Sequence, residues 1–139
     1  MEWSRGNFAV TTDRSRFDMD FVVRSLQGAW RRGAKRESIE GAFANSLSFG
    51  LFDGRKQIGC VRAVTDRTFV SWVCDLFLDP SCRGKGLGRW LMECVMNHPD
   101  LVGTRLVFSS VPESQAFYER VGFKPMDRGY SMPARRTGR

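Results

Sequence analysis

The stretch that decides the fold is DLFLDPSCRGKGLGRWLMECVMNHPD, residues 75–100. It starts as an apolar run, passes through Pro80 into a turn that holds three glycines and three basic residues, and continues as a helical pattern. From Leu87 onward, apolar residues recur at the spacing of three and four that is typical of an amphipathic helix, which predicts a helix from Gly86 to His98. A strand therefore ends and a helix begins across a turn whose backbone is largely bare.

The residues around this stretch predict a sheet. Segments 47–52, 57–65 and 68–78 alternate apolar and polar side chains, and an Asp-Gly loop joins the first two, so they predict a three-stranded antiparallel meander. Other patterns predict strands at 7–12, 104–110 and from 123 onward, and helices within 16–30, 37–46 and 112–121. The crossover through the helix 86–98 implies one parallel strand pair. The predicted fold class is mixed α/β (α+β), with a mainly antiparallel sheet flanked by helices.

Strand 68–78 has two predicted faces. Period-two alternation predicts one face with Val70, Trp72, Cys74, Leu76 and Leu78, and the opposite face with Ser71, Val73, Asp75 and Phe77.

Length and composition place limits on the protein class. The chain has 139 residues with 42% hydrophobic content, enough for one domain over 1–139 with its own core. Residues 133–139 are expected to form a disordered basic tail. No apolar run is long enough to span a membrane and the N-terminus lacks a secretory pattern, so we expect a cytoplasmic protein without a membrane contact.

The cysteines and the single histidine predict no metal site, because the four cysteines are irregularly spaced and His98 is the only imidazole. We expect reduced thiols. Cys60, Cys74 and Cys94 fall at apolar positions and are expected in the core, whereas Cys82 beside Arg83 is a candidate for a lowered pKa. His98 is expected to complement the helix dipole at the end of its helix and not to act in catalysis.

The glycine-rich turn predicts an anion site. Glycines let backbone N–H groups converge on a phosphate at a helix N-terminus, and Arg83, Lys85 and Arg89 add positive charge. The net charge of +7 also suits a polyanionic partner. The ATP pattern fails because no Gly-Lys-Ser/Thr occurs, and the dinucleotide pattern fails because Arg89 stands where a glycine is required. The alternative is that the glycines only make a tight turn.

Two motifs carry a family resemblance. Arg83-x-x-Gly86-x-Gly88 resembles the acetyl-CoA signature R/Q-x-x-G-x-G/A of the GNAT N-acetyltransferase superfamily. AFYERVGF, residues 116–123, looks like the segment that closes the cofactor site of that family. The resemblance covers residues 47–126 and extends back to about residue 18.

The resemblance implies acetyl-CoA as cosubstrate, with no metal. The pyrophosphate would rest on amides of the glycine-rich turn, and pantetheine would pair with a strand splayed from its parallel neighbour. Many family members carry Asn or Thr after the next strand, whereas this chain reads SSVPES, so Ser109, Ser110 or Ser114 would take that place. The expected cofactor-binding residues are Leu76, Phe77, Leu78, Arg83, Gly84, Lys85, Gly86, Leu87, Gly88, Arg89 and Ser114.

The implied activity is N-acetyltransfer from acetyl-CoA to a primary amine by direct attack in a ternary complex. Tyr118 matches the tyrosine of the family that protonates the departing thiolate. Asp75 is the candidate general base, expected on the strand face away from the core; the alternative is a water chain to another acid, with Asp75 structural. Trp30, Phe43 and Trp72 are expected to contact the acceptor.

Two other functions stay open. A GNAT-fold protein could bind CoA without catalysis, in which case Tyr118 and Asp75 would be dispensable. A basic nucleic-acid-binding module is the other alternative, but no helix-turn-helix, zinc-finger or RNP pattern supports it, so nucleic acid is not the favoured partner. The expected partner is a small-molecule or peptide amine. Dimers are common in the family, although no feature of the sequence fixes one here.

Overall fold

The computed structural model describes residues 1–126 and 128–134. The chain divides into two compact units, Met1–Ser109 and Ser110–Arg139, so the single domain over 1–139 stays a prediction. Of the expected basic tail, residues 133 and 134 have no regular structure, and residues 135–139 lie outside the described part of the chain.

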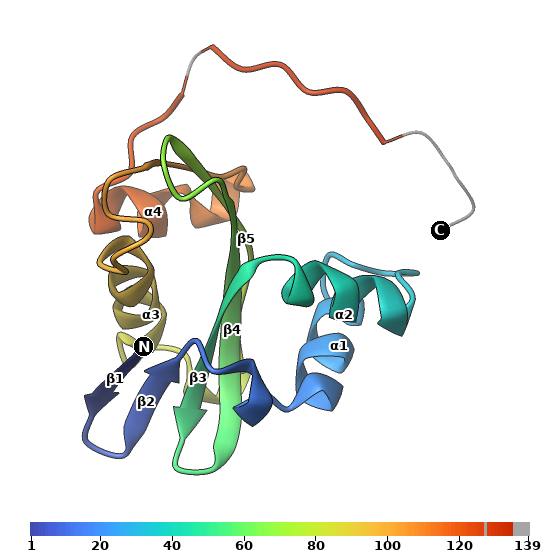
Figure 1. The fold of residues 1–139 in the computed structure, drawn as a ribbon, viewed down its shortest axis with the longest axis vertical. Coiled ribbons are helices and arrows are strands. Elements are labelled where there is room, and N and C mark those ends of the chain that lie inside the picture. The colour runs from blue at the N-terminus through green and yellow to red at the C-terminus, as the bar shows by residue number, and fades with distance from the viewer. Residues whose placement is uncertain (127, 135–139) are drawn as a thin grey trace. The chain divides into compact units, whose positions relative to one another are not determined.

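The first unit is a six-stranded sheet with helices on both faces. The strands follow the chain in the order β1-β2-β3-β4-β5-β6, and every neighbouring pair is antiparallel except the parallel pair β5–β6. Figure 1 shows α1 and α2 on one face and α3 on the other, which confirms the predicted fold class. The strands are β1 (Glu2–Arg5), β2 (Phe8–Thr11), β3 (Leu47–Asp53), β4 (Lys56–Thr65), β5 (Val70–Leu78) and β6 (Arg105–Val107); the helices are α1 (Met19–Gln27), α2 (Arg36–Ala44) and α3 (Leu87–Met96), with 3₁₀ turns η1 (Arg14–Arg16) and η2 (Pro80–Cys82).

Helix α1 begins where the sequence supplies a cap. The Asp18 side chain accepts a hydrogen bond from the backbone N–H of Phe21 (3.1 Å), which satisfies one of the free donors of the first turn. The apolar side chains of α1 and α2 then pack together against the sheet. This core cluster comprises Phe21, Val22, Val23, Leu26, Ile39, Phe43 and Cys60.

The cysteines and His98 only partly follow expectation. All four thiols are free, and Cys60 and Cys94 are buried as predicted, but Cys74 is only partly covered. His98 follows α3 and is buried: its ring lies 5.7 Å from that of Phe49 and 6.2 Å from that of Trp3. Its Nδ1 accepts from the Asp100 N–H. His98 therefore packs against aromatic rings at the end of α3, and its interaction with the helix dipole stays a prediction.

The second unit contains η3 (Pro112–Ser114) and α4 (Gln115–Val121), and α4 ends at Gly122 with φ of +111° as the sequence predicted. The predicted strand from residue 123 is wrong, because residues 123–126 form no strand. Pro125 in this segment has no backbone N–H to donate to a ladder. At the other end of the chain β1 was missed, because its single apolar side chain, Trp3, gives no alternation to detect.

Candidate active site

Strand β5 has an open edge. It pairs with β6 only over Val70–Trp72, opposite Arg105–Val107. In the described part of the chain no strand pairs with residues 73–78 on that side. Backbone N–H and C=O groups of an unpaired edge can bind an extended ligand that carries amides. The expected parallel pair is therefore present, but it is short because β6 spans only Arg105–Val107 and not 104–110. The predicted residues Leu76, Phe77 and Leu78 lie beyond it, on the unpaired part of β5.

A β-bulge interrupts β5 in the same region. Cys74 pairs with Arg62 and Phe77 with Cys60, so two residues of β5, Asp75 and Leu76, lie opposite the single residue between those partners. Asp75 has φ of +57°, an uncommon backbone conformation for a residue with a side chain.

The bulge also changes which residues share a face. Because Cys60 and Arg62 lie two apart on β4, their partners Phe77 and Cys74 share one face of β5. The predicted grouping of Leu76 and Leu78 with Trp72 and Cys74 is therefore wrong beyond the bulge, where the extra residue breaks the period of two.

The turn after β5 presents bare backbone at the start of α3. Gly84 and Gly86 have φ of +83° and +76°, and a Cβ atom at either would meet no atom within 4 Å. Glycine is thus required by the backbone conformation and not by crowding. Gly86 is the N-cap of α3 and supplies no side-chain hydrogen bond, so the N–H groups of the first turn stay available to an anion.

Basic side chains surround this turn. Arg83 and Lys85 are exposed, and the Nε of Arg83 donates to the carbonyl of Leu78 (3.2 Å), which anchors the arginine beside the end of β5. Arg89 is exposed and pairs with Glu93 one turn later (3.0 Å). Open N–H groups with neighbouring cations form a donor set that suits a diphosphate. The segment Arg83–Arg89 thus continues the open edge of β5 into a turn whose exposed donors suit an anion.

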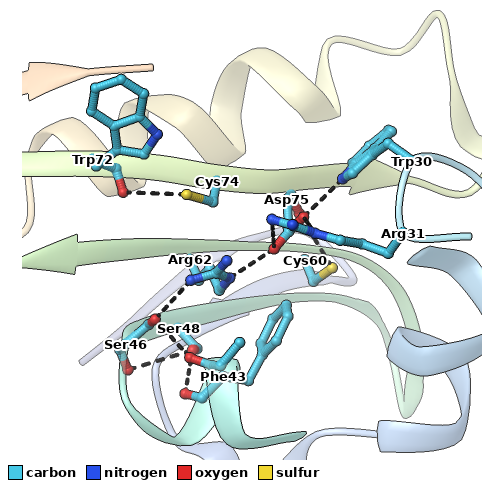
Figure 2. A network of polar contacts seen from close by, with 11 residues as sticks. Trp30, Arg31, Phe43, Ser46, Ser48, Cys60, Arg62, Trp72, Cys74 and Asp75 are labelled. Carbon is cyan, nitrogen blue, oxygen red and sulfur yellow. Dashed lines mark hydrogen bonds and ion pairs between the residues drawn. The ribbon is translucent and has the colours of Figure 1, made fainter. Parts of the chain in front are cut away.

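Asp75 is the centre of a polar cluster (Figure 2). Its carboxylate accepts four hydrogen bonds: from Trp30 Nε1 (2.8 Å), Arg31 Nε (2.9 Å), Arg31 Nη2 (3.2 Å) and Arg62 Nε (2.7 Å). Arg62 also donates to the Ser46 hydroxyl (3.1 Å). The cluster therefore joins the bulge of β5 to β4 and to the loop between α1 and α2.

These contacts change the interpretation of Asp75. The residue is buried (8% exposed). The prediction that it lies on the face of β5 away from the core is therefore wrong. Burial by itself would raise its pKa, but the hydrogen bonds from Arg31, Trp30 and Arg62 outweigh burial and hold the pKa below its usual value. A carboxylate that stays ionised and has both oxygens occupied is a poor proton acceptor, so this geometry disfavours Asp75 as the general base.

The three aromatic residues expected at the acceptor site differ in position. Trp30 and Trp72 are 54% and 43% exposed, so both can contact a ligand. Phe43 is 1% exposed and belongs to the core cluster, so the prediction that it contacts the acceptor is wrong. Its ring instead lies 6.0 Å from the guanidinium carbon of Arg62.

Tyr118 and Ser114 belong to the second unit. The Tyr118 ring packs edge-on to Phe117 and Phe123, with centroids 5.1 and 6.1 Å away, and burial raises the pKa of its phenol. A phenol with a raised pKa holds its proton at neutral pH, as a general acid must. Ser114 is the N-cap of α4 and makes no side-chain capping bond. The roles given to these two residues stay predictions.

Arg31 and Arg62 belong to the cluster although their sequence pattern had not predicted a role for either. Arg62 stands inside the apolar run of β4, two residues from Cys60 on the same face. A lone cation at such a position requires a counter-ion, and that signal could have identified Asp75 as its partner. Nothing in the sequence distinguishes Arg31 from its neighbour Arg32.

Neither a metal site nor a membrane span is found in the described ranges. No group of three or more His, Cys, Asp or Glu side chains there could hold a metal ion. None of the helices described has the length and apolar content that crossing a membrane requires.

Comparisons with known proteins agree on one family. Residues 44–125 match the family model described as "Acetyltransferase (GNAT) domain". A Gibberella zeae protein assigned as an acetyltransferase is 24% identical, over 88% of this chain and 82% of its own length. A crystal structure from Xanthomonas campestris, assigned to the same family, is 30% identical with a TM-score of 0.81 and covers 88% of this chain and 93% of that one.

A more distant structure contains a ligand. AAC(6′)-Iy, in complex with the bisubstrate analogue CoA-S-monomethyl-acetylneamine, is 18% identical with a TM-score of 0.73, and the match covers 92% of this chain and 98% of that one. At this identity the likeness concerns the fold.

Proposed function

The chain belongs to the GNAT acetyltransferase family, whose members transfer acetyl groups from acetyl-CoA, and we propose that it acetylates a primary amine by direct attack in a ternary complex. One observation carries the proposal: the open edge of β5 runs directly into a glycine turn at an uncapped helix N-terminus. A ligand with an extended amide arm and a diphosphate matches both parts. The complex of AAC(6′)-Iy with a CoA-based analogue supports a CoA site on this fold.

The cofactor would lie along β5 and end at α3. Its amide arm pairs with backbone groups of Leu76–Leu78, and its diphosphate accepts hydrogen bonds from N–H groups of the turn Arg83–Arg89. Because the contacts are mostly backbone groups, side-chain changes there act through conformation and charge. In this proposal the expected cofactor residues of the first unit, those of Leu76–Leu78 and Arg83–Arg89, bind successive parts of one ligand.

In the reaction, the amine nitrogen attacks the thioester carbonyl carbon, the C–N bond forms and the C–S bond breaks. A backbone N–H beside the bulge stabilises the oxyanion. Tyr118 gives its proton to the departing thiolate. The proton of the amine leaves through water, because Asp75 is held ionised by arginines and instead positions the bulge.

Direct attack fits the thiols of Cys60, Cys74 and Cys94 better than an acyl-enzyme on any of these three does. Burial raises the pKa of Cys60, of Cys74 and of Cys94, the last to about 11, and a protonated thiol is a weak nucleophile. The four free cysteines also suit the reducing cytoplasm, which we include in the proposal. An acetylated peptide of this protein, formed with acetyl-CoA alone, would argue against direct attack.

A thermal-shift titration with acetyl-CoA tests the site, with ATP, NAD and a short oligonucleotide as controls. Ligand at about a hundred times its Kd adds about 2.7 kcal/mol of apparent stability. Gly86→Asp should abolish the shift by placing negative charge in the turn. Gly6→Asp is the matched control, because Gly6 also has positive φ (+59°) and open surroundings but lies in the β1–β2 turn.

Either of two outcomes overturns the proposal. Retained acetyl-CoA binding in Gly86→Asp would mean that the turn does not hold the diphosphate. Stabilisation by the oligonucleotide alone, lost as salt increases, would place the protein among nucleic-acid-binding modules.

A further inference from the structure

Arg31 has one edge of its guanidinium fixed and the other open. Its Nε and Nη2 bind the two oxygens of the buried Asp75 carboxylate at 2.9 and 3.2 Å. Among the described residues, its Nη1 has no hydrogen-bond partner, and the side chain is 42% exposed. A guanidinium clamped along one edge offers its remaining N–H groups in a fixed direction, which lowers the entropic cost of binding a second anion.

The charge around Arg31 favours an anion. Two guanidinium groups, those of Arg31 and Arg62, share the single carboxylate of Asp75, so this cluster retains one positive charge. The sequence from residue 21 to residue 36 contains no acidic residue and five basic ones, Arg24, Arg31, Arg32, Lys35 and Arg36. Besides Arg31, which binds Asp75, only Arg36 of these five is paired with carboxylates in the described structure, those of Asp20 and Glu40.

Trp30 provides an apolar surface that is held by the same carboxylate oxygen as Arg31. Its Nε1 is bound to Asp75 at 2.8 Å, which fixes the ring, yet the residue is 54% exposed. The ring lies 6.3 Å from that of Phe77 on the open part of β5. A ligand that contacts Trp30 would therefore lie next to the segment of β5 where the thioester is proposed to bind.

We propose that the acceptor is a small primary amine that also carries a carboxylate or a phosphate. The anionic group binds the open edge of Arg31, the carbon frame lies against Trp30, and the amine reaches the thioester on β5. This inference rests on the proposed acetyltransfer and names its substrate class. Polycationic amines are disfavoured by the same positive charge.

Matched amine pairs test the proposal. Release of free CoA thiol is measured for L-phenylalanine against L-phenylalaninamide, for 2-aminoethyl phosphate against ethanolamine, and for spermidine. The amide lowers the pKa of its neighbouring amine, so intrinsic reactivity favours phenylalaninamide at a given pH. A higher kcat/KM for the acid of either pair therefore reports recognition of the anion, and the better pair distinguishes carboxylate from phosphate.

Variants connect the preference to Arg31. Losing a charged hydrogen bond predicts that Arg31→Gln lowers kcat/KM for the anionic amine about 10- to 100-fold, mostly through KM, and changes its neutral partner much less. Arg31→Lys keeps the positive charge but lacks the two-pronged guanidinium, so its kcat/KM for the anionic amine should lie between those of the wild type and Arg31→Gln. Arg32→Gln is the matched control: it removes the same charge from the same loop, and Arg32 makes no contact with Asp75 in the described structure.

The outcomes separate this inference from the proposed function. Without acetyl-CoA binding or CoA release for any amine, the proposed function fails. With acetyl-CoA bound and turned over, equal rates for each pair, a preference for spermidine, or the same loss of preference in Arg32→Gln and Arg31→Gln overturns the inference. Thermal unfolding of each variant shows whether it is folded. If Arg31→Gln does not fold, Arg31→Lys tests the preference in its place.

Discussion

Asp75→Asn removes one charge from the centre of the cluster and leaves its shape nearly unchanged. Asn, like Asp, tolerates positive φ better than most residues that carry a side chain, so the substitution adds little backbone strain at the bulge. The Arg62 side chain is only 11% exposed and would lose its counter-ion, whereas Arg31, at 42%, can rehydrate. Breaking a fully buried pair costs about 3–5 kcal/mol. With one arginine partly exposed, we expect a loss of about 2–4 kcal/mol.

Urea denaturation at neutral pH measures this loss, with Arg62→Met and the double variant completing a cycle. Because the Arg62→Met background has no buried cation at this position, Asp75→Asn should cost less there than in the wild type. A loss under about 0.5 kcal/mol, typical of an ordinary surface change, or full additivity in the cycle would refute the view of Asp75 as a buried counter-ion.

The pH dependence of the same difference has a definite sign. The pKa of Asp75 is lowered in the folded state, so its contribution is fully present above the unfolded value of about 3.9 and is lost as pH falls through the folded pKa. The stability gap between wild type and Asp75→Asn should therefore be constant near neutrality and shrink below about pH 4. A gap that widens on acidification would contradict the proposed ionisation state.

Other predictions concern separate residues. Tyr118→Phe should lower turnover by roughly ten- to a thousandfold with acetyl-CoA affinity nearly intact, as steady-state kinetics and calorimetry would show; an unchanged rate would remove Tyr118 from the mechanism. Burial lowers the pKa of His98, so the free energy of unfolding should fall as pH drops below about 6.5. His98→Gln should reduce this pH dependence in urea titrations; an equally strong pH dependence in the variant would mean that another group causes it. A thiol reagent should label Cys82 and Cys74 in the native protein before Cys60 and Cys94, which are buried; early labelling of Cys60 would mean that the core opens.

The sequence predicted those elements whose side-chain periodicity is long and regular. The meander and α3 have such patterns. The glycines of the turn indicate its backbone conformation, because other residues avoid positive φ. The bulge at Asp75 has no such signal, because one extra residue leaves the strand as apolar as before. That residue nevertheless moves every later side chain of β5 to the opposite face of the sheet. Phe43 was misassigned for a related reason: an aromatic side chain has the same apparent pattern in a core and in a binding site.

The position of Asp75 links the two halves of the proposed site. Its backbone forms the bulge at the open edge of β5, and its side chain holds Trp30 and Arg31 of the loop between α1 and α2. A change in the loop therefore removes hydrogen bonds from the residue that shapes the bulge, and a change at the bulge releases the loop. Arg31→Gln should for this reason also raise KM for acetyl-CoA, but by much less than it raises KM for the anionic amine. Comparing KM for acetyl-CoA with KM for the amine measures that coupling directly, because a side chain that contacted the acceptor alone would change only the second.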